Sequence, residues 1–312
     1  MWYIHAPYYE VEKNMGSDAR AEWFQRAIDA GADEADVVVE GCKIRYVTWG
    51  EVGKPGIVLI HGSNAHLEWW RFVAPFLADQ FRVAAMDLSG HGDSGWRERY
   101  SGEVYAREVK AVCEDAQLGE KPFVVAHSFG GFVALETGHH FSPELGGIIF
   151  GDFTVSPPEV YTEWGKQAEA RGGQAARPTR IYEGFDTALN RFRLVPEQPC
   201  PYPYVLDHIG RNSLRQVDGG WTWKFDPTMY DHLEMGVEQA DKYAGLQCRS
   251  ALILGEHSED EGAFSAPYMA EITDGTLPVI TIPATHHHFM FEEPMATVAA
   301  IKGIIMAWLQ AG

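Results

Sequence analysis

Short, continuously apolar runs recur along the sequence, and they constrain the fold more than any other feature. Each run is bounded by turn residues or charges, and together they cover 57–60, 81–86, 123–126, 148–150, 251–254 and 279–282. Apolar residues at every position, rather than at alternate positions, are typical of strands that are buried on both faces. The sequence therefore predicts a sheet whose inner strands are covered on both sides.

Amphipathic stretches with helical periodicity lie between most of these runs, at 67–78, 102–117, 130–140 and 294–310. Strands that alternate with helices favour an α/β fold with a doubly wound, mostly parallel sheet. Before the first run, residues 36–40 and 43–49 are rich in Val, Ile, Tyr and Thr around Gly41, which predicts a β-hairpin at the start of the sheet.

The alternation breaks once, because about a hundred residues separate the runs that end at Phe150 and begin at Ala251. This segment is rich in aromatic residues and in proline. We expect a 1–35 N-terminal extension, a core formed by 36–152 and 240–312, and a mainly helical cap inserted at 153–239. The alternative for 153–239 is a packed helical subdomain with no lid function.

The N-terminal extension is expected to contain a short helix that Ser17 caps, with an apolar stripe that includes Trp23 and Phe24. Covering the flank of the core is the expected role of this stripe, and a homodimer contact is the alternative. The start of the chain has no basic segment followed by an apolar run, so a cytoplasmic protein with no membrane association is expected.

Composition narrows the classes of partner. The 312 residues include 25 Lys and Arg against 44 Asp and Glu, a formal net charge of −19 that argues against binding nucleic acid. The four cysteines are far apart and form no CxxC motif, which argues against a disulfide framework and a zinc knuckle. A small-molecule substrate is the expected partner.

Ser128 lies where catalytic chemistry is expected. It follows the apolar run 123–126 directly and precedes a predicted helix, within Ala126-His127-Ser128-Phe129-Gly130. A serine on so sharp a strand-to-helix turn needs small residues two positions away on each side, and Ala126 and Gly130 meet this need. The turn also places Ser128 at a helix N-terminus, where backbone amides favour a developing anion.

Two further motifs precede this serine in the chain, namely His61-Gly62-Ser63 and the segment from Asp87 to Ser94 with its two turn glycines. In this order, the three motifs resemble the α/β-hydrolase superfamily over residues 36–150 and 249–310. The resemblance implies that Ser128 is a nucleophile and that the backbone amides of Ser63 and Phe129 form an oxyanion hole. Alanine at position 126 is a mild departure from the family's usual glycine.

The resemblance also implies a histidine base after the last strand. Counting back from Pro294 assigns this role to His287 within the run 286–288. Neighbouring side chains of an extended segment point to opposite faces, so three consecutive histidines are not expected to share a metal ion. The expected site contains no metal and needs no cofactor, and His61 and His127 are expected to be hydrogen-bonded parts of their loops.

A histidine base needs a carboxylate partner, and three positions are candidates. The family usually supplies the acid after the penultimate strand, where Gly255 begins a loop that contains several acids. In the family's usual spacing, the acid would fall at position 258, which is a serine here. A loop one or two residues longer would place Glu259 or Asp260 at the acid's position. Asp260 is the favoured residue, Glu259 is the first alternative, and Asp152 after the strand 148–150 is the second.

A serine at this turn predicts attack on a carbonyl group through an acyl-enzyme, whereas an aspartate would have predicted attack on an alkyl carbon. The expected activity is that of a carboxylesterase on a small to medium apolar ester. Arginines of the insertion offer an anchor for a monoester of a dicarboxylic acid, a substrate type for which monoalkyl phthalate hydrolases are possible relatives. Lactone or carbon-carbon bond hydrolysis and a non-catalytic small-molecule receptor are the alternatives.

Overall fold

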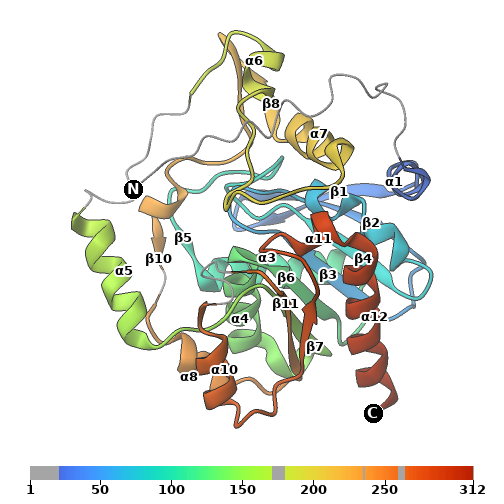
Figure 1. Ribbon diagram of the computed structural model, residues 1–312, viewed down its shortest axis with the longest axis vertical. Helices are drawn as coiled ribbons and strands as arrows, with labels where there is room; N and C mark the ends of the chain where they lie inside the picture. The colour runs from blue at the N-terminus through green and yellow to red at the C-terminus, as the bar shows by residue number, and fades with distance from the viewer. Residues whose placement is uncertain (1–20, 171–179, 235, 259–263, 312) are drawn as a thin grey trace.

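An eight-stranded sheet forms the centre of the structure, a computed structural model that describes residues 21–170, 180–234, 236–258 and 264–311 (Figure 1). β2 pairs antiparallel with both β1 and β4, and the other neighbours are parallel. Across the sheet the strands follow the order β1 (Asp33–Val39), β2 (Cys42–Trp49), β4 (Arg82–Met86), β3 (Gly56–Ile60), β6 (Phe123–His127), β7 (Gly147–Gly151), β11 (Ser250–Gly255) and β12 (Val279–Ile282).

The inner strands are buried on both faces, as the continuous apolar runs predict. Every residue of β3, β6 and β7 is buried. The predicted hairpin is also present, although β1 begins at Asp33 and pairs this residue with Thr48. β1 therefore includes residues 33–35, which were expected to belong to the N-terminal extension.

Helices cover the two faces of the sheet in separate layers. One layer packs against a core that includes Trp70, Phe291 and Ile301 and consists of α1 (Glu22–Ile28), α2 (Glu68–Arg71), α11 (Phe289–Glu292) and α12 (Pro294–Gln310). The other packs against a core that includes Tyr105 and Phe132 and consists of α3 (Gly102–Asp115), α4 (Phe129–Phe141), α8 (Gln239–Ala244) and α10 (Ala266–Ile272). This arrangement is the predicted doubly wound fold.

The stretch 67–78 departs from the prediction of one helix. It forms the single turn of α2, then the 3-10 helix η1 (Ala74–Phe76). Pro75 lies in η1 and has no backbone N–H to donate to the preceding turn, so a continuous α-helix cannot pass through it. Apolar residues on both sides of the break, including Trp70, Phe72 and Leu77, are still buried.

Between β7 and β11 the chain leaves the sheet, and we call residues 153–239 the insertion. Figure 1 shows α6, α7 and β8 gathered above the strands, with α5 to one side. The elements of the insertion are α5 (Pro158–Ala170), α6 (Phe185–Leu189), α7 (Pro203–Asn212), β8 (Leu214–Val217), β9 (Gly220–Trp223), η3 (Met229–Asp231) and β10 (Leu233–Glu234). One short helix and one short strand outside it are η2 (Ser142–Glu144) and β5 (Tyr100–Ser101). β10 pairs with β5, which ties the end of the insertion to the core.

The N-terminal helix joins the core and the insertion. Phe24 of α1 is fully buried, and Trp23 contacts Phe72 of the core and Tyr202 of the insertion edge to face. Ser17 lies outside the described residues, and the residue before α1 is Ala21, which makes no side-chain cap. Within the described ranges, no helix is long and apolar enough to span a bilayer.

Candidate active site

Ser128 occupies the sharp turn between β6 and α4. Its backbone has φ 54° and ψ −125°, a conformation that is uncommon for a residue with a side chain. Two backbone hydrogen bonds hold the turn, since Ser128 N donates to Gly151 O at 2.9 Å and Gly131 N donates to Ser128 O at 2.7 Å. This strained geometry presents the hydroxyl at the end of the strand, as in a nucleophile elbow.

The residues around the turn are small because there is no space for larger ones. A Cβ atom at Gly130 would lie 2.6 Å from the carbonyl oxygen of His61, and one at Gly131 would lie 2.3 Å from the ring of Phe153. These distances are shorter than any ordinary contact. The small residue expected two positions after Ser128 is therefore a steric requirement of this packing.

His287 lies against Ser128, as the sequence predicts. Its Nε2 atom is 3.0 Å from Ser128 Oγ, and the imidazole is 3% exposed. The residue follows β12 in a turn that leads into α11. The end of one strand therefore positions the hydroxyl, and the loop after another strand positions the imidazole.

The carboxylate that meets His287 is Asp152, which the sequence analysis ranked third. Asp152 Oδ1 lies 3.0 Å from His287 Nδ1, and Asp152 is completely buried. Because Asp152 directly follows β7, next to β6 in the sheet, it reaches the histidine without a long loop. The favoured residues Asp260 and Glu259 lie outside the described residues.

The sequence contains a signal for this arrangement at position 258. Usual spacing in the loop after β11 places the acid there, but the residue is a serine whose Oγ donates to Asp152 Oδ1 at 2.6 Å. Gly255 N donates to Asp152 Oδ2 at 3.0 Å. A serine at the usual acid position, together with an aspartate immediately after β7, indicates that the acid and its hydrogen-bond donor come from different strands.

Two segments that carry backbone amides border the Ser128 side chain. Phe129 is the first residue of α4, and amides of a first helical turn have no acceptor within the helix. The loop that carries Ser63 approaches closely, since a Cβ atom at Gly62 would lie 3.1 Å from Ser128 Cβ. The predicted residues Ser63 and Phe129 thus come from the two segments that border the hydroxyl.

The histidine loop is held from both sides by side-chain hydrogen bonds. Glu292 accepts from His286 N at 2.6 Å and pairs with its Nδ1 at 2.9 Å. Gln198, from the insertion, accepts from His288 N at 2.7 Å and donates to Glu292 at 2.9 Å. One amide group of the insertion therefore bridges the loop and the helix α11 that follows it.

Aromatic side chains of the insertion reach the surroundings of Ser128. The Tyr230 ring meets the Phe129 ring edge to face, with 5.8 Å between their centroids. On the other side, Trp69 contacts the rings of His288 and Phe291 at 5.2 and 4.8 Å. Aromatic rings therefore lie next to Phe129 and His288, the neighbours in sequence of Ser128 and His287.

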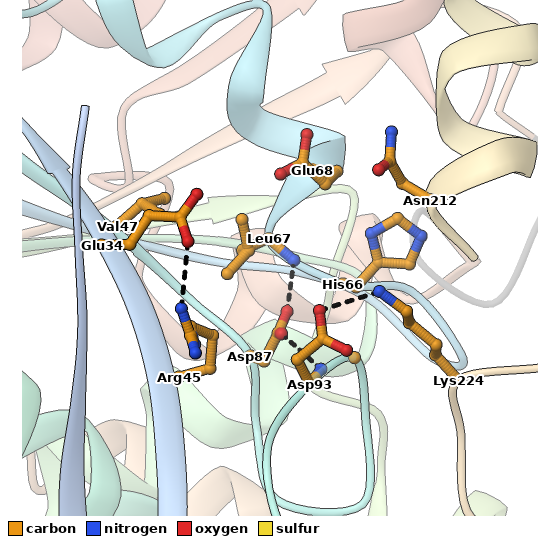
Figure 2. A pocket seen from close by; sticks show the side chains of 11 residues that line it. Glu34, Arg45, Val47, His66, Leu67, Glu68, Asp87, Asp93, Asn212 and Lys224 are labelled. Atoms are coloured by element: carbon orange, nitrogen blue, oxygen red, sulfur yellow. Dashed lines mark hydrogen bonds and ion pairs between the residues drawn. The ribbon is translucent and has the colours of Figure 1, made fainter. Parts of the chain in front are cut away.

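Polar pairs join the insertion to the core around a cavity of about 60 Å³ (Figure 2). Lys224 pairs with Asp93 at 2.8 Å, and His208 pairs with Glu68 at 2.8 Å. Figure 2 shows Lys224 reaching across to Asp93, which lies beside the buried Asp87. Because Lys224 and His208 belong to the insertion, these contacts hold it on the core.

Among the acids that line this cavity, Asp87 is the most deeply buried. Its two carboxylate oxygens accept hydrogen bonds from Leu67 N at 2.6 Å and from Asp93 N at 2.8 Å. Burial raises the pKa of Asp87 to about 7, although the two backbone donors oppose this shift. The carboxylate fixes both the loop before α2 and the turn from Asp87 to Ser94.

Replacing Asp87 with asparagine is expected to lower the free energy of unfolding by about 1–3 kcal/mol. An amide has a single oxygen, so its NH₂ group must face one of the two backbone donors in a buried site. Denaturant unfolding measures the change. Asp93→Asn is the matched control, because the Asp93 side chain is 56% exposed and its ion pair is expected to contribute less than about 1 kcal/mol. Equal losses from both variants would contradict the assignment.

Comparisons with known proteins find relatives of this chain among the hydrolases. The sequence profile described as the alpha/beta hydrolase family matches residues 57–301. Esterase Rv0045c of Mycobacterium tuberculosis is 24% identical over 302 residues, which cover 90% of this chain and 92% of that protein. Pimeloyl-(acyl-carrier protein) methyl ester esterase of Edwardsiella ictaluri is 34% identical over 186 residues, which cover 53% of this chain and 68% of that protein.

Solved structures share the fold at low sequence identity. E-2-(acetamidomethylene)succinate hydrolase superposes with a TM-score of 0.73 and 18% identity, covering 88% of this chain and 99% of that one. A structure of the mycobacterial esterase superposes with a TM-score of 0.66 and 21% identity, covering 91% and 95%. Since the family profile spans well over half of the sequence, we conclude that this chain belongs to the alpha/beta hydrolase family.

Proposed function

We propose that this hydrolase cleaves carboxylic esters through an acyl-enzyme. The observation that carries the proposal is the continuous chain of contacts from Ser128 Oγ through His287 to Asp152, with both distances at 3.0 Å. In this arrangement the histidine can accept the serine proton while the carboxylate fixes its tautomer and stabilises the imidazolium. The esterases among the relatives support ester bonds as the substrate class.

The reaction divides into two halves. Ser128 Oγ attacks the ester carbonyl carbon while His287 Nε2 takes its proton, and the oxyanion is stabilised by the amides of Ser63 and Phe129. Collapse of this intermediate breaks the bond to the alcohol, which leaves with the proton from His287. A water molecule then repeats the attack on the acyl-enzyme, and the acid is released with Ser128 restored.

The surroundings favour an ester whose acid part carries no charge. A monoester of a dicarboxylic acid needs a cation near Ser128, yet three of the described arginines of the insertion are engaged elsewhere. Arg211 pairs with Asp207, and Arg180 and Arg215 lie over the rings of Tyr182 and Trp96. Arg191 and Arg193 are exposed, and Arg177 lies outside the described residues.

Ester hydrolysis over a series of acyl chain lengths tests the proposal. Burial of each added CH₂ contributes about 0.8 kcal/mol, so kcat/KM for p-nitrophenyl esters should rise roughly threefold to fourfold per methylene until the pocket is full. A matched series with a terminal carboxylate should show no advantage. Tight binding of the esters with no release of acid would contradict the proposal and favour a receptor.

A further inference from the structure

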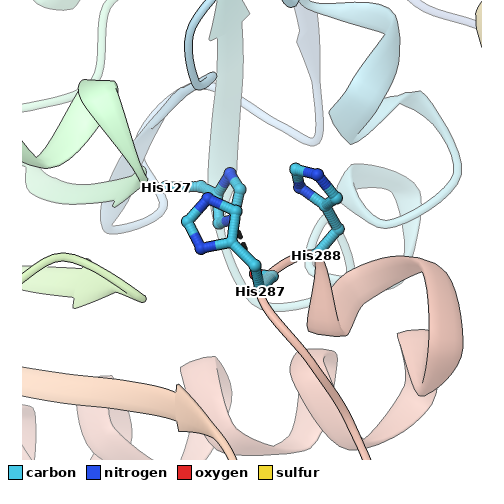
Figure 3. Close-up of side chains that lie close together, drawn as sticks. All are labelled: His127, His287 and His288. Atoms are coloured by element: carbon cyan, nitrogen blue, oxygen red, sulfur yellow. Dashed lines mark hydrogen bonds between the residues drawn. The ribbon is translucent and has the colours of Figure 1, made fainter. Parts of the chain in front are cut away.

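Three buried imidazoles gather beside the candidate nucleophile, and the ester chemistry uses only one of them. His127, His287 and His288 are 1, 3 and 3% exposed, and one potential ligand atom from each lies within 4.8 Å of the others. Figure 3 shows the rings facing one another, from the end of β6 and from the turn before α11. His287 and His288 share one side because they lie in a turn, so the alternation expected of an extended segment does not apply.

Hydrogen bonding gives His127 the tautomer of a metal ligand. Its Nε2 lies 2.8 Å from the carbonyl oxygen of His287, and a carbonyl can only accept, so Nε2 carries the proton. The lone pair is then on Nδ1, which is buried and has no hydrogen-bond partner among the described residues. Burial lowers the pKa of His127 well below its usual range, so the ring is neutral.

The free nitrogen of His127 faces the reacting space. A Cβ atom at Gly62 would lie 3.2 Å from His127 Nδ1 and 3.1 Å from Ser128 Cβ. The missing side chain of Gly62 therefore leaves a space that both groups border. A ligand held by His127 Nδ1 would lie next to the serine.

His288 adds a second unused ring. Neither of its nitrogens forms a hydrogen bond of good geometry within the described residues, although both are buried and the Val195 carbonyl is close to the ring. Burial and the neighbouring His287 lower the pKa of His288 to about 3, against the opposing effect of the nearby Val195 carbonyl. The ring is therefore neutral at physiological pH and always presents one lone pair. A buried polar group without a well-formed hydrogen bond is costly, so a ligand for this ring would be favourable.

His287 completes the donor set. Its Nδ1 faces Asp152, which places the lone pair on Nε2, the atom that faces Ser128 Oγ. A histidine that binds a metal through one ring nitrogen commonly donates the N–H of its other ring nitrogen to a carboxylate. Zinc binds imidazole nitrogen at about 2.0–2.1 Å, so small ring rotations would bring the three nitrogens onto one ion.

We propose that His127, His287 and His288 bind one divalent transition ion such as Zn²⁺ or Cu²⁺, and that the bound ion inhibits the enzyme. Three imidazole nitrogens suit these ions, whereas Mg²⁺ and Ca²⁺ require oxygen ligands. The ion takes the Nε2 lone pair that would otherwise accept the proton of Ser128. Inhibition rests on the proposed function, whereas binding does not.

Binding is tested by calorimetry with Zn²⁺ and by electron paramagnetic resonance with Cu²⁺, where the hyperfine pattern reports nitrogen ligands. Ser128→Ala should bind as the wild type does, because the hydroxyl is not a ligand. His288→Phe and His288→Asn should each weaken binding roughly 10–100-fold or more. His139→Asn/His140→Asn is the matched control, since these exposed neighbours are also adjacent histidines and should contribute nothing.

The results separate the two proposals. Zn²⁺ should inhibit ester hydrolysis by the wild type, a chelator should restore the rate, and Mg²⁺ should have no effect. Inhibition of the His288 variants should require correspondingly more Zn²⁺. Unchanged binding in both folded His288 variants, loss of binding in the His139/His140 variant, or no binding by the wild type would overturn the site. A protein that binds the ion but cleaves no ester would instead overturn the proposed function.

Discussion

Ser128→Ala is expected to lower kcat for ester hydrolysis by about 10⁴-fold or more, with little change in folding. Alanine removes the only atom that can form the acyl-enzyme and leaves the backbone of the turn in place. The variant should also fail to react with a fluorophosphonate probe that labels the wild type, which mass spectrometry measures directly. Residual hydrolysis then comes from the oxyanion amides and from substrate binding.

Ser101→Ala is a suitable control for this substitution. Its hydroxyl accepts a hydrogen bond from Val104 N at the start of α3, so its removal should reduce stability by about 1 kcal/mol and leave kcat unchanged. A Ser128 variant that keeps near wild-type activity and probe labelling would show that another group is the nucleophile.

Asp152→Asn is expected to lower kcat by about 10⁴-fold with little effect on substrate binding. Asparagine fits the same space, but its amide cannot stabilise the imidazolium and can turn an N–H toward His287 Nδ1, which favours the wrong tautomer. Circular dichroism and thermal unfolding should show that the fold is retained. Steady-state kinetics on one p-nitrophenyl ester would measure the loss.

The acids of the loop after β11 are the controls for Asp152. Asp260→Asn and Glu259→Gln should each change kcat only slightly if Asp152 is the acid that His287 requires. The opposite order, with a large loss from Asp260→Asn or Glu259→Gln and a small one from Asp152→Asn, would transfer the role to this loop.

Most strands and helices are predictable from the sequence. Strands that are buried on both faces appear as continuous apolar runs, and helices with one face exposed to solvent appear as apolar residues at helical spacing. The run 123–126 and the stretch 294–310 match β6 and α12 nearly residue for residue. The prediction of one continuous helix is wrong at 67–78, where Pro75 interrupts a stretch whose apolar residues otherwise have helical spacing. There the missing backbone N–H of one proline outweighs the helical periodicity of its neighbours.

The candidate site is predictable to the extent that each residue follows a strand directly. Ser128 is found in this way, because it comes directly after the run 123–126, whereas His287 is found by counting back from Pro294 in the pattern that the resemblance implies. The partner of His287 is harder to predict, since the order of the strands in space decides which carboxylate is near. The clustering of His127 with His288 requires the conformation of a turn, which residue types alone do not specify.

The bridge formed by Gln198 has a consequence for how this enzyme could be re-engineered. Its amide holds the backbone of His288 and the carboxylate of Glu292, so the position of the proton acceptor depends on a side chain outside the core. Exchange of residues 153–239 with the corresponding segment of a relative would therefore alter the catalytic rate as well as substrate preference. A functional chimera must keep an amide at position 198 or provide another donor and acceptor there.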